Sequence, residues 1–384
     1  MITRAAQPIV CGSTKSVLLL GPRQTGKSTL AAQANPALLL NLMHEPTFLS
    51  FAANPLELEQ RLGALPARKP ATVVLDEVQR LPSLLNTVQT VLDSPSNRFR
   101  FILTGSSARK LRRGQANLLP GRVITAHLGP LVARELQYQL PTQQALSTGT
   151  LPGIFTEADD LTRQAVLRSY AATYLKEEVQ AESLTRNLEG FARFLYVVSE
   201  WAGKFLDLTK MASSAQINRQ SAIRYFEVLE DCLIVFRVEA FSASATRRTI
   251  QHPRFYFFDV GVLNGLLGNF QVSSDRIGGL FEHLVITQIH HTLRALYVPW
   301  TLHTYRTEAG AEVDLVVRKP KEVVAIELKA STNVGPSDLR SFHSFADYYG
   351  KPHEQQVWYL GSERRRIGSI DILPWQVGLQ QLGL

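Results

Sequence analysis

Short apolar runs separated by polar turns organise the first third of the chain. Runs of strand length occupy residues 16–20 (SVLLL) and 99–107 (FRFILTGSS), and a further apolar run that ends in two acids opens residues 71–82 (ATVVLDEVQRLP). The start of a helix follows the first run at 28–33. Short apolar runs of this kind are typical of buried strands, and a strand followed directly by a helix is typical of an α/β unit. The pattern therefore predicts an α/β domain over residues 1–148.

Helical spacing replaces the strand pattern in the middle of the chain. Apolar residues recur near helical spacing over 160–179, as expected for a helix that packs on a core. Residues 191–238 then show three helical segments followed by a strand, which is the order of a winged helix-turn-helix. We therefore predict a helical and winged-helix region over 149–268.

The third of these helices is the one that enters the DNA major groove in a winged helix-turn-helix. Its exposed N-terminal part would carry Asn218, Arg219, Gln220, Ser221 and Arg224. Winged helices also serve as protein-contact modules, so the sequence leaves both DNA and a protein open as partners of this helix.

A helix, three strand-like runs, a second helix and a fourth strand make up the last part of the chain. The first helix covers 278–296, the three runs lie within 301–331, and the second helix extends over about 337–349. This order predicts a third, smaller α/β domain, which we place at 269–384.

Residues 21–28, GPRQTGKS, lie at the turn between the first strand and its helix and fit the pattern G-x-x-x-x-G-K-[ST]. The glycines allow backbone amides to curl round phosphate oxygens, Lys27 would reach the β- and γ-phosphates, and Ser28 would bind Mg²⁺. The predicted nucleotide-binding residues of this loop are Gly21, Pro22, Arg23, Gln24, Thr25, Gly26, Lys27, Ser28 and Thr29.

Two acids follow the second strand, where a nucleotide-hydrolysing site needs a metal ligand and a base. Asp76 would hold Mg²⁺ directly or through water, and Glu77 would polarise the attacking water. The third run ends in hydroxyl residues, so Thr104 or Ser106 would lie near the γ-phosphate as a sensor. The sequence thus predicts a complete site for hydrolysing a nucleoside triphosphate.

Arg122 would reach the nucleotide site of a neighbouring subunit as an arginine finger, with Arg112 and Arg113 as rivals and a solvated surface arginine as the alternative. The order of phosphate loop, acidic strand, sensor strand and arginine resembles the AAA-type ATPases, in which the acidic strand is not the immediate neighbour of the phosphate-loop strand. The chain has no N-K-x-D motif for reading guanine, which favours ATP as the nucleotide. An arginine finger also predicts a homo-oligomer.

A second constellation of acids lies near the end of the chain. Within IELK, the period of two places Glu327 and Lys329 on one face of a strand. If the preceding strand runs antiparallel beside it, Asp314 comes close to Glu327, and these carboxylates would bind Mg²⁺ while Lys329 orients or activates water. The arrangement resembles the PD-(D/E)XK nuclease superfamily, and this resemblance implies Glu282 as an additional acid and metal ligand. The alternative is a surface ion pair between Glu327 and Lys329.

The composition narrows the class of protein without naming its activity. The 384 residues are 45% hydrophobic and 19% charged, which is typical of a folded protein of several domains. The formal net charge of +8 is compatible with a polyanionic partner such as DNA. No apolar run approaches the roughly 18 residues that cross a bilayer, so we expect no membrane partner and a cytoplasmic location. Two cysteines are too few for a disulfide framework.

The chain as a whole resembles a large prokaryotic family of AAA-type ATPases with a C-terminal domain of unknown function. The resemblance rests on GPRQTGKST, VVLDEVQRLP, LTGSSARKL and LPGR, and further along on FYFFDVGVLNGLLG and GLFEHLVITQI. It implies ATP hydrolysis. Together with the motifs above it gives the hypothesis of an ATPase whose winged helix and nuclease-like domain engage DNA, with DNA cleavage as a further activity. The alternative is a nucleotide-controlled switch that binds other proteins and whose nuclease-like fold no longer cuts.

Overall fold

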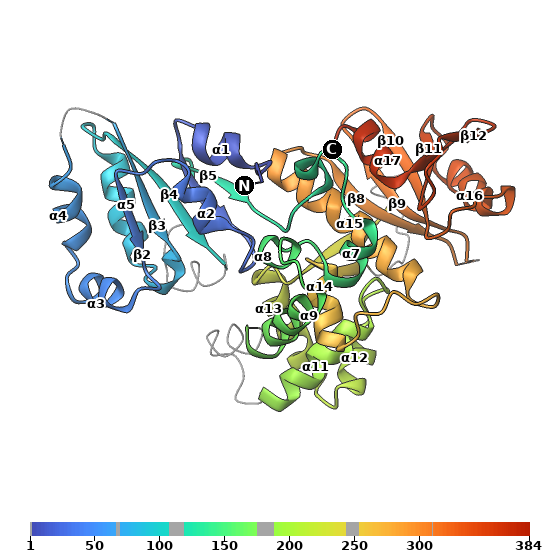
Figure 1. Cartoon of the computed structure of the whole chain (residues 1–384), viewed down its shortest axis with the longest axis horizontal. Coiled ribbons are helices and arrows are strands. Elements are labelled where there is room, and N and C mark those ends of the chain that lie inside the picture. Colours follow the sequence, from blue (N-terminus) through green and yellow to red (C-terminus); the bar gives the residue numbers. More distant parts are fainter. Residues whose placement is uncertain (1, 67–69, 107–118, 175–187, 243–252, 309) are drawn as a thin grey trace. The chain divides into compact units, whose positions relative to one another are not determined.

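A computed structural model describes residues 2–66, 70–106, 119–174, 188–242, 253–308 and 310–384 (Figure 1). The chain divides into two units. The first comprises 1–129 with the short segments 231–233 and 294–296, and the second comprises 130–230, 234–293 and 297–384. The predicted division into three domains stays a proposal.

A parallel sheet with the strand order β2-β3-β4-β1-β5 forms the centre of the first unit. Its strands are β1 (Ser16–Leu20), β2 (Leu38–Asn41), β3 (Ala71–Asp76), β4 (Phe99–Gly105) and β5 (Val123–His127). All five residues of β1 are buried, as expected for a strand covered on both faces. The strand β4 lies between β1 and β3, which confirms the predicted separation of the acidic strand from the phosphate-loop strand.

The two faces of this sheet pack against different helices, and alternate residues of β1 separate them. Leu18 and Leu20 belong to an apolar cluster with residues of α3 (Glu45–Ala53), α4 (Glu57–Gly63) and α5 (Leu84–Asp93). Val17 and Leu19 belong to a second cluster, with residues of α1 (Gln7–Gly12) and α2 (Lys27–Ala32). Because side chains of a strand alternate between faces, SVLLL is long enough to contribute to both layers.

The second unit contains a mixed sheet with the order β12-β13-β11-β10-β9-β8-β6-β7. Its strands are β6 (Val235–Ala240), β7 (Arg254–Phe257), β8 (Thr301–Arg306), β9 (Glu312–Arg318), β10 (Val323–Lys329), β11 (Glu354–Tyr359), β12 (Arg365–Ile367) and β13 (Ile370–Pro374). The long helix α15 (Ile277–Leu296) precedes β8, and α16 (Arg340–Tyr349) joins β10 to β11 (Figure 1). The predicted order of helix, three strands, helix and strand is therefore present.

The two faces of this second sheet also have separate cores. Residues of α15 and α17 (Trp375–Leu382) pack with Val324, Ile326 and Trp358 on one face. Residues of α16 pack with Ala325 and Tyr359 on the other face. Glu327 and Lys329 follow Ala325 by steps of two residues, so both lie on the face that α16 covers.

The middle of the chain folds as helices that lead into this sheet. The segment contains α7 (Thr142–Thr148), α8 (Pro152–Phe155), α9 (Asp160–Ser169) and a π-helical turn (Tyr170–Tyr174), and then α11 (Leu188–Glu200), α12 (Leu208–Ser214), α13 (Arg219–Asp231) and, after the β6–β7 hairpin, α14 (Val260–Leu267). The strands β6 and β7 are antiparallel, and a single bridge joins Phe205 to Arg254. Three helices followed by a strand, α11 to α13 and then β6, are the predicted order of elements, and the type of this domain stays a proposal.

A buried carboxylate fixes the start of α14 within the second unit. Asp259 accepts hydrogen bonds from the backbone amides of Val262 at 3.0 Å and Thr150 at 2.8 Å. Burial raises the pKa of Asp259 to about 6. Gly149 approaches so closely that an added Cβ would lie 2.1 Å from Oδ1 of Asp259, which explains a glycine there. Among the described residues of both units, no helix has the length and apolar character required to cross a bilayer.

Candidate functional site

The loop between β1 and α2 closes round the ammonium group of Lys27. This side chain is only 4% exposed, and its Nζ donates hydrogen bonds to the carbonyl oxygens of Gly21 and Pro22, both at 2.9 Å. Gly26 has a φ of 89°, a left-handed conformation that favours glycine. At Gly21 an added Cβ would lie 2.1 Å from the carbonyl oxygen of Leu128. Both glycines of the motif are thus required by the path of the backbone.

Arg4 stabilises the loop from outside, and sequence reasoning missed it. Its side chain is 7% exposed and donates hydrogen bonds to the carbonyl oxygens of Thr25 at 2.6 Å and Gly129 at 2.7 Å. The Thr25 hydroxyl in turn donates to the carbonyl oxygen of Pro22 at 2.9 Å. The loop is therefore held in shape by side chains as well as by its glycines. Of the other predicted loop residues, Gln24, Ser28 and Thr29 are exposed.

The carboxylate of Asp76 joins the loop to the sensor strand. Its Oδ1 accepts hydrogen bonds from the Ser28 hydroxyl at 3.0 Å and from the Thr104 hydroxyl at 2.5 Å. A hydroxyl and a carboxylate in direct contact are the oxygen ligands that Mg²⁺ prefers. Ser28 and Asp76 therefore fit the metal that a bound nucleotide would bring, and that metal would neutralise charge on the β- and γ-phosphates.

Glu77 occupies a special backbone position at the end of β3. Its φ of 61° is left-handed, which is uncommon for a residue that is not glycine. Its amide donates a hydrogen bond to the Thr104 hydroxyl at 3.0 Å. The Thr104 hydroxyl thus contacts both acids, because it donates to the Asp76 carboxylate and accepts from the backbone amide of Glu77. Backbone strain of this kind persists where the surroundings hold it, and at this position Thr104 does so.

Gln79 is a second residue that sequence reasoning missed. Its side chain is 8% exposed, and its Nε2 donates hydrogen bonds to the Glu77 carboxylate and to the Ser106 hydroxyl, the latter at 3.0 Å. Within the described residues its Oε1 has no partner. Gln79 therefore orients the predicted base, and Ser106 contacts the site through Gln79. The only sequence signal was the spacing of two residues from Glu77.

The predicted arginine finger is paired within the single chain. Nε of Arg122 lies 2.6 Å and Nη2 2.8 Å from the carboxylate oxygens of Asp93, at the end of α5. Both side chains are partly exposed, and hydrogen bonding to Asp93 raises the pKa of Arg122. The role of Arg122 in a neighbouring subunit stays a prediction. Arg112 and Arg113 lie outside the described residues.

The second constellation forms where β9 and β10 run antiparallel, as its prediction requires. Oδ2 of Asp314 accepts a hydrogen bond from the amide of Leu328 at 2.8 Å. Lys329 donates to Glu327 at 2.9 Å, and the Ser341 hydroxyl of α16 donates to the same carboxylate at 3.3 Å. Asp314, Glu327 and Lys329 thus lie together, and the ion pair that the sequence left open between Glu327 and Lys329 is present.

Glu282 has protein partners of its own. Its Oε1 lies 2.8 Å from Nη1 of Arg254 and 2.6 Å from the Tyr256 hydroxyl, which donates to it. Arg254, 8% exposed, also pairs with Glu312. Among the described residues, no group of three or more His, Cys, Asp or Glu is arranged to hold a metal. The metal role of Glu282, Asp314 and Glu327 therefore stays a prediction.

Burial and mutual repulsion govern the protonation of these acids. Burial raises the pKa of Asp314, of Glu282 and of Glu327, and the charge of Asp314 adds to the rise at both glutamates. Arg254 opposes the rise at Glu282, and Lys329 opposes it at Glu327. The cluster therefore combines buried acids with two cations that offset their charge.

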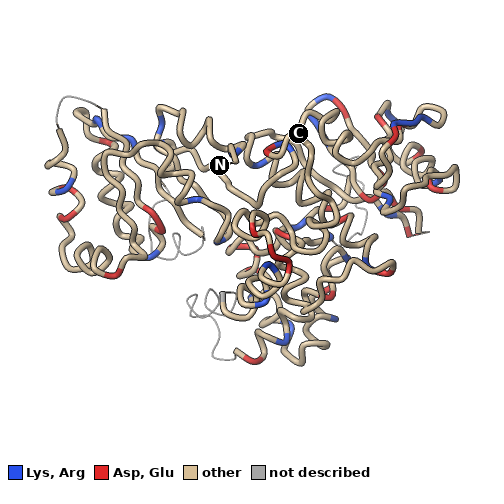
Figure 2. Tube along the Cα trace, in the orientation of Figure 1, with Lys and Arg blue, Asp and Glu red and all other residues tan. Residues whose placement is uncertain are grey.

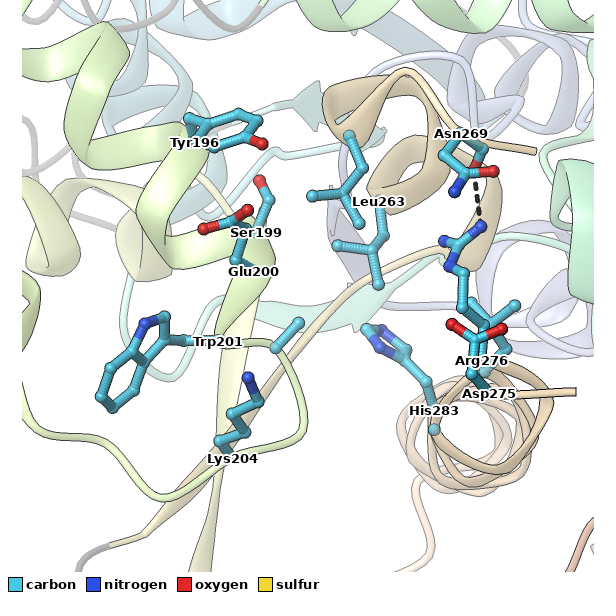
Figure 3. A pocket seen from close by; sticks show the side chains of 14 residues that line it. Tyr196, Ser199, Glu200, Trp201, Lys204, Leu263, Asn269, Asp275, Arg276 and His283 are labelled. Atoms are coloured by element: carbon cyan, nitrogen blue, oxygen red, sulfur yellow. Dashed lines mark hydrogen bonds between the residues drawn. The ribbon is translucent and has the colours of Figure 1, made fainter. Parts of the chain in front are cut away.

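A hollow of about 660 Å³ lies between α11, α14 and the start of α15 (Figure 3). Trp201 and Lys204 line one side, and Arg276 and His283 line the other. His283 contacts the carbonyl oxygen of Phe257 through Nε2 at 2.7 Å, and burial lowers its pKa to about 4, so this ring is neutral. Because a carbonyl only accepts, Nε2 carries the proton. No sequence pattern indicated this hollow.

Three stretches of the chain match known family models. Residues 13–137 match a model described as an AAA domain. Residues 141–273 and 277–377 match two models described as domains of unknown function, DUF8612 and DUF4143. The sheet order, the phosphate loop and this match together define an AAA-type P-loop ATPase domain. The chain carries this domain followed by two domains of unknown function.

This chain is similar to two relatives and to one solved structure. An uncharacterized protein of Mycobacterium tuberculosis is 28% identical over 334 residues, covering 85% of this chain and 73% of its own. An uncharacterized protein of Methanocaldococcus jannaschii is 23% identical over 288 residues, covering 68% of this chain and 62% of its own. A STAND signal-transduction ATPase with a tetratricopeptide repeat sensor from Pyrococcus horikoshii is 14% identical, with a TM-score of 0.28, and matches 77% of this chain and 47% of its own.

Proposed function

We propose that the protein binds ATP with Mg²⁺ and hydrolyses it at the site formed by the phosphate loop, Asp76 and Glu77. The observation that carries the proposal is the position of Asp76, whose carboxylate contacts both Ser28 and Thr104. Lys27 and the loop amides bind the phosphates, and Ser28 and Asp76 hold the metal. Glu77 accepts a proton from the attacking water, and Thr104 and Gln79 position the carboxylates.

The proposal includes assembly into a homo-oligomer in which Arg122 reaches a neighbouring nucleotide. Arginine fingers are worth about 10³–10⁵ in turnover, so Arg122→Ala should lower the ATPase rate by roughly a thousandfold or more. Asp93→Ala should leave turnover unchanged or raised, because it frees Arg122 without removing it. Phosphate release should be measured over a range of protein concentrations, with size-exclusion chromatography in the presence and absence of ATP.

The paired variants separate the finger from a structural ion pair. If Arg122 only stabilises the end of α5, both substitutions break the same contact and should change the rate equally. If the two variants change the ATPase rate equally, or if Arg122→Ala has a normal rate, the role of Arg122 as an arginine finger is contradicted.

We further propose that nucleotide state controls the engagement of DNA by the winged-helix region and the C-terminal domain. Around the start of α13, Asn218, Arg219, Gln220 and Arg224 are exposed, and the Asn218 side chain accepts a hydrogen bond from the amide of Ser221 at 2.7 Å. A capped helix start with two exposed arginines presents charge and hydrogen-bonding groups of the kind that contact DNA. The formal net charge of +8 is consistent with this partner.

A variant that binds ATP without hydrolysing it tests whether the bound nucleotide controls DNA binding. We expect the DNA affinity of Glu77→Gln to differ between saturating ATP and saturating ADP by about 5- to 150-fold, the range of ordinary coupling energies. Fluorescence anisotropy of a labelled duplex measures this. DNA binding with equal affinity in both states would refute the coupling while leaving DNA as a partner.

A second candidate function has one observation in its favour. Arg254 pairs with Glu282, and Lys329 pairs with Glu327, so the predicted metal-binding acids already have protein partners. This favours a nuclease-like fold that does not cleave, within a nucleotide-controlled switch that binds proteins. Incubation with Mg²⁺ or Mn²⁺ and several DNA forms tests it, with Asp314→Ala as control. Metal-dependent cleavage that Asp314→Ala removes would exclude the inactive fold.

A further inference from the structure

The strand registers bring a run of arginines to the same end of the second sheet as the cluster formed by Asp314, Glu327 and Lys329. Lys329 at the end of β10 pairs with Tyr359 on β11, which pairs with Pro374 on β13. The strand β12 is antiparallel to β13, with Arg365 opposite Ile372. Residues 364–366, which we call the arginine hairpin, therefore lie near the end of the sheet where Glu327 and Lys329 lie.

The arginines of this hairpin are exposed on an edge strand. Arg364, Arg365 and Arg366 are all exposed, and in Figure 2 the trace at β12 has a continuous blue stretch, the colour of basic residues. Arg366 is held by an ion pair with Asp371 at 2.6 Å. Arg365 lies 5.6 Å from the ring centre of Tyr359. Among the described residues, Arg364 has no ion pair. Two of the three guanidinium groups are thus free of carboxylate partners within the described chain.

The turn before β12 is fixed rather than loosely attached. The Tyr359 hydroxyl donates a hydrogen bond to the carbonyl oxygen of Glu363 at 2.7 Å. Gly361 lies so close that an added Cβ would be 2.0 Å from the Tyr359 ring. Because the turn is anchored on both sides of residue 362, the arginines that follow it are presented in a defined position at little cost in conformational entropy.

The hairpin and the cluster also share one face of the sheet. Ile367 packs on the same core as Tyr359, and Arg365 is two residues before Ile367, so Arg365 lies on this face. Glu327 and Lys329 lie there too. From β10 to β12 there are three strand spacings, about 14 Å at roughly 4.8 Å each. A duplex whose axis followed this end of the sheet would present about four phosphates of each strand over that distance.

We propose that the arginine hairpin binds the phosphate backbone of nucleic acid and places it along the sheet end that carries Lys329. The proposal rests on the proposed engagement of DNA and names the surface that carries it. Guanidinium groups match phosphate oxygens in charge and geometry, and their contacts are independent of base sequence. An anionic membrane is the weaker partner, because no large hydrophobic residue of the described chain after position 297 is exposed for insertion.

The test compares two double variants of equal charge change in the full-length protein. Arg364→Ala/Arg365→Ala removes the free guanidinium groups. Lys321→Ala/Lys351→Ala removes two exposed lysines at the opposite end of the same sheet, before β10 and β11. Each protein is titrated into a fluorescein-labelled duplex of about 20 base pairs between about 0.05 and 0.2 M salt, and into phosphatidylserine vesicles. Thermal unfolding followed by circular dichroism confirms that each variant is folded.

The arginine variant should bind the duplex roughly ten- to a hundredfold more weakly at about 0.1 M salt, with the slope of log affinity against log salt reduced by about 2. The lysine variant should bind within about twofold of wild type. If wild type and the arginine variant bind the duplex equally, the proposal that the arginine hairpin binds the phosphate backbone is refuted. The proposed engagement of DNA by the protein would remain. A wild-type protein that binds no duplex would overturn both proposals. Loss of vesicle binding alone would assign the hairpin to a membrane surface instead.

Discussion

Replacing Lys27 with alanine is expected to abolish ATP turnover and to lower ATP affinity by at least roughly a hundredfold. The Lys27 ammonium is buried inside the loop, 2.9 Å from two loop carbonyl oxygens, and in the proposed function it contacts the β- and γ-phosphates. Hydrogen bonds to charged groups contribute about 1.5–3 kcal/mol each, so losing the two that this ammonium would donate to the β- and γ-phosphates of bound ATP accounts for the expected factor. Isothermal titration with ATP and steady-state phosphate release measure the two effects.

Lys15→Ala is the matched control for this variant. Lys15 is exposed and directly precedes β1, so it lies at the opposite end of that strand from the loop. The control removes the same charge from the same unit and should leave ATP binding and turnover within about twofold of wild type. Normal turnover in Lys27→Ala would contradict the assignment of the loop.

Glu77→Gln is expected to retain ATP binding and to lose hydrolysis by about 10²–10⁴, the usual contribution of a general base. The amide has nearly the shape of the carboxylate and can still accept the hydrogen bond from Gln79. It cannot accept a proton from the attacking water. Affinity for ATP should therefore stay within a few-fold of wild type, whereas single-turnover conversion of bound ATP to ADP should almost stop.

Glu59→Gln provides the comparison, since Glu59 is exposed on α4 in the same unit. It should hydrolyse ATP at the wild-type rate. Should Glu77→Gln convert bound ATP as fast as Glu59→Gln, the base must be another residue. A loss of ATP binding in Glu77→Gln would instead give Glu77 a role in holding the nucleotide.

Three of the five strands in the sheet of the first unit, β1, β3 and β4, were predictable because they are continuous apolar runs. The run at 16–20 coincides with β1, the stretch at 71–82 begins with β3, and the run at 99–107 contains β4. Such runs are buried on both faces, so their local signal does not depend on distant contacts. The phosphate loop was also predictable from the sequence, because Gly21, Gly26 and Lys27 belong to one short contiguous motif.

Residues that act across long sequence separations were not predictable. Arg4 reaches Thr25 and Gly129, and nothing in its neighbourhood marks it as a loop anchor. Glu282 has the spacing of a nuclease-like acid, but the sequence does not show that Arg254 folds against it. Such partners depend on how β7 and α15 pack, which a residue pattern does not encode.

The central claim, that this chain hydrolyses ATP with Mg²⁺ at the loop of Lys27 and the acids of β3, is tested most directly by phosphate release from the purified wild-type protein. We predict release that continues over many turnovers with Mg²⁺ and stops when EDTA removes the metal. Release that never exceeds the EDTA background, in a protein that binds ATP, would contradict the claim.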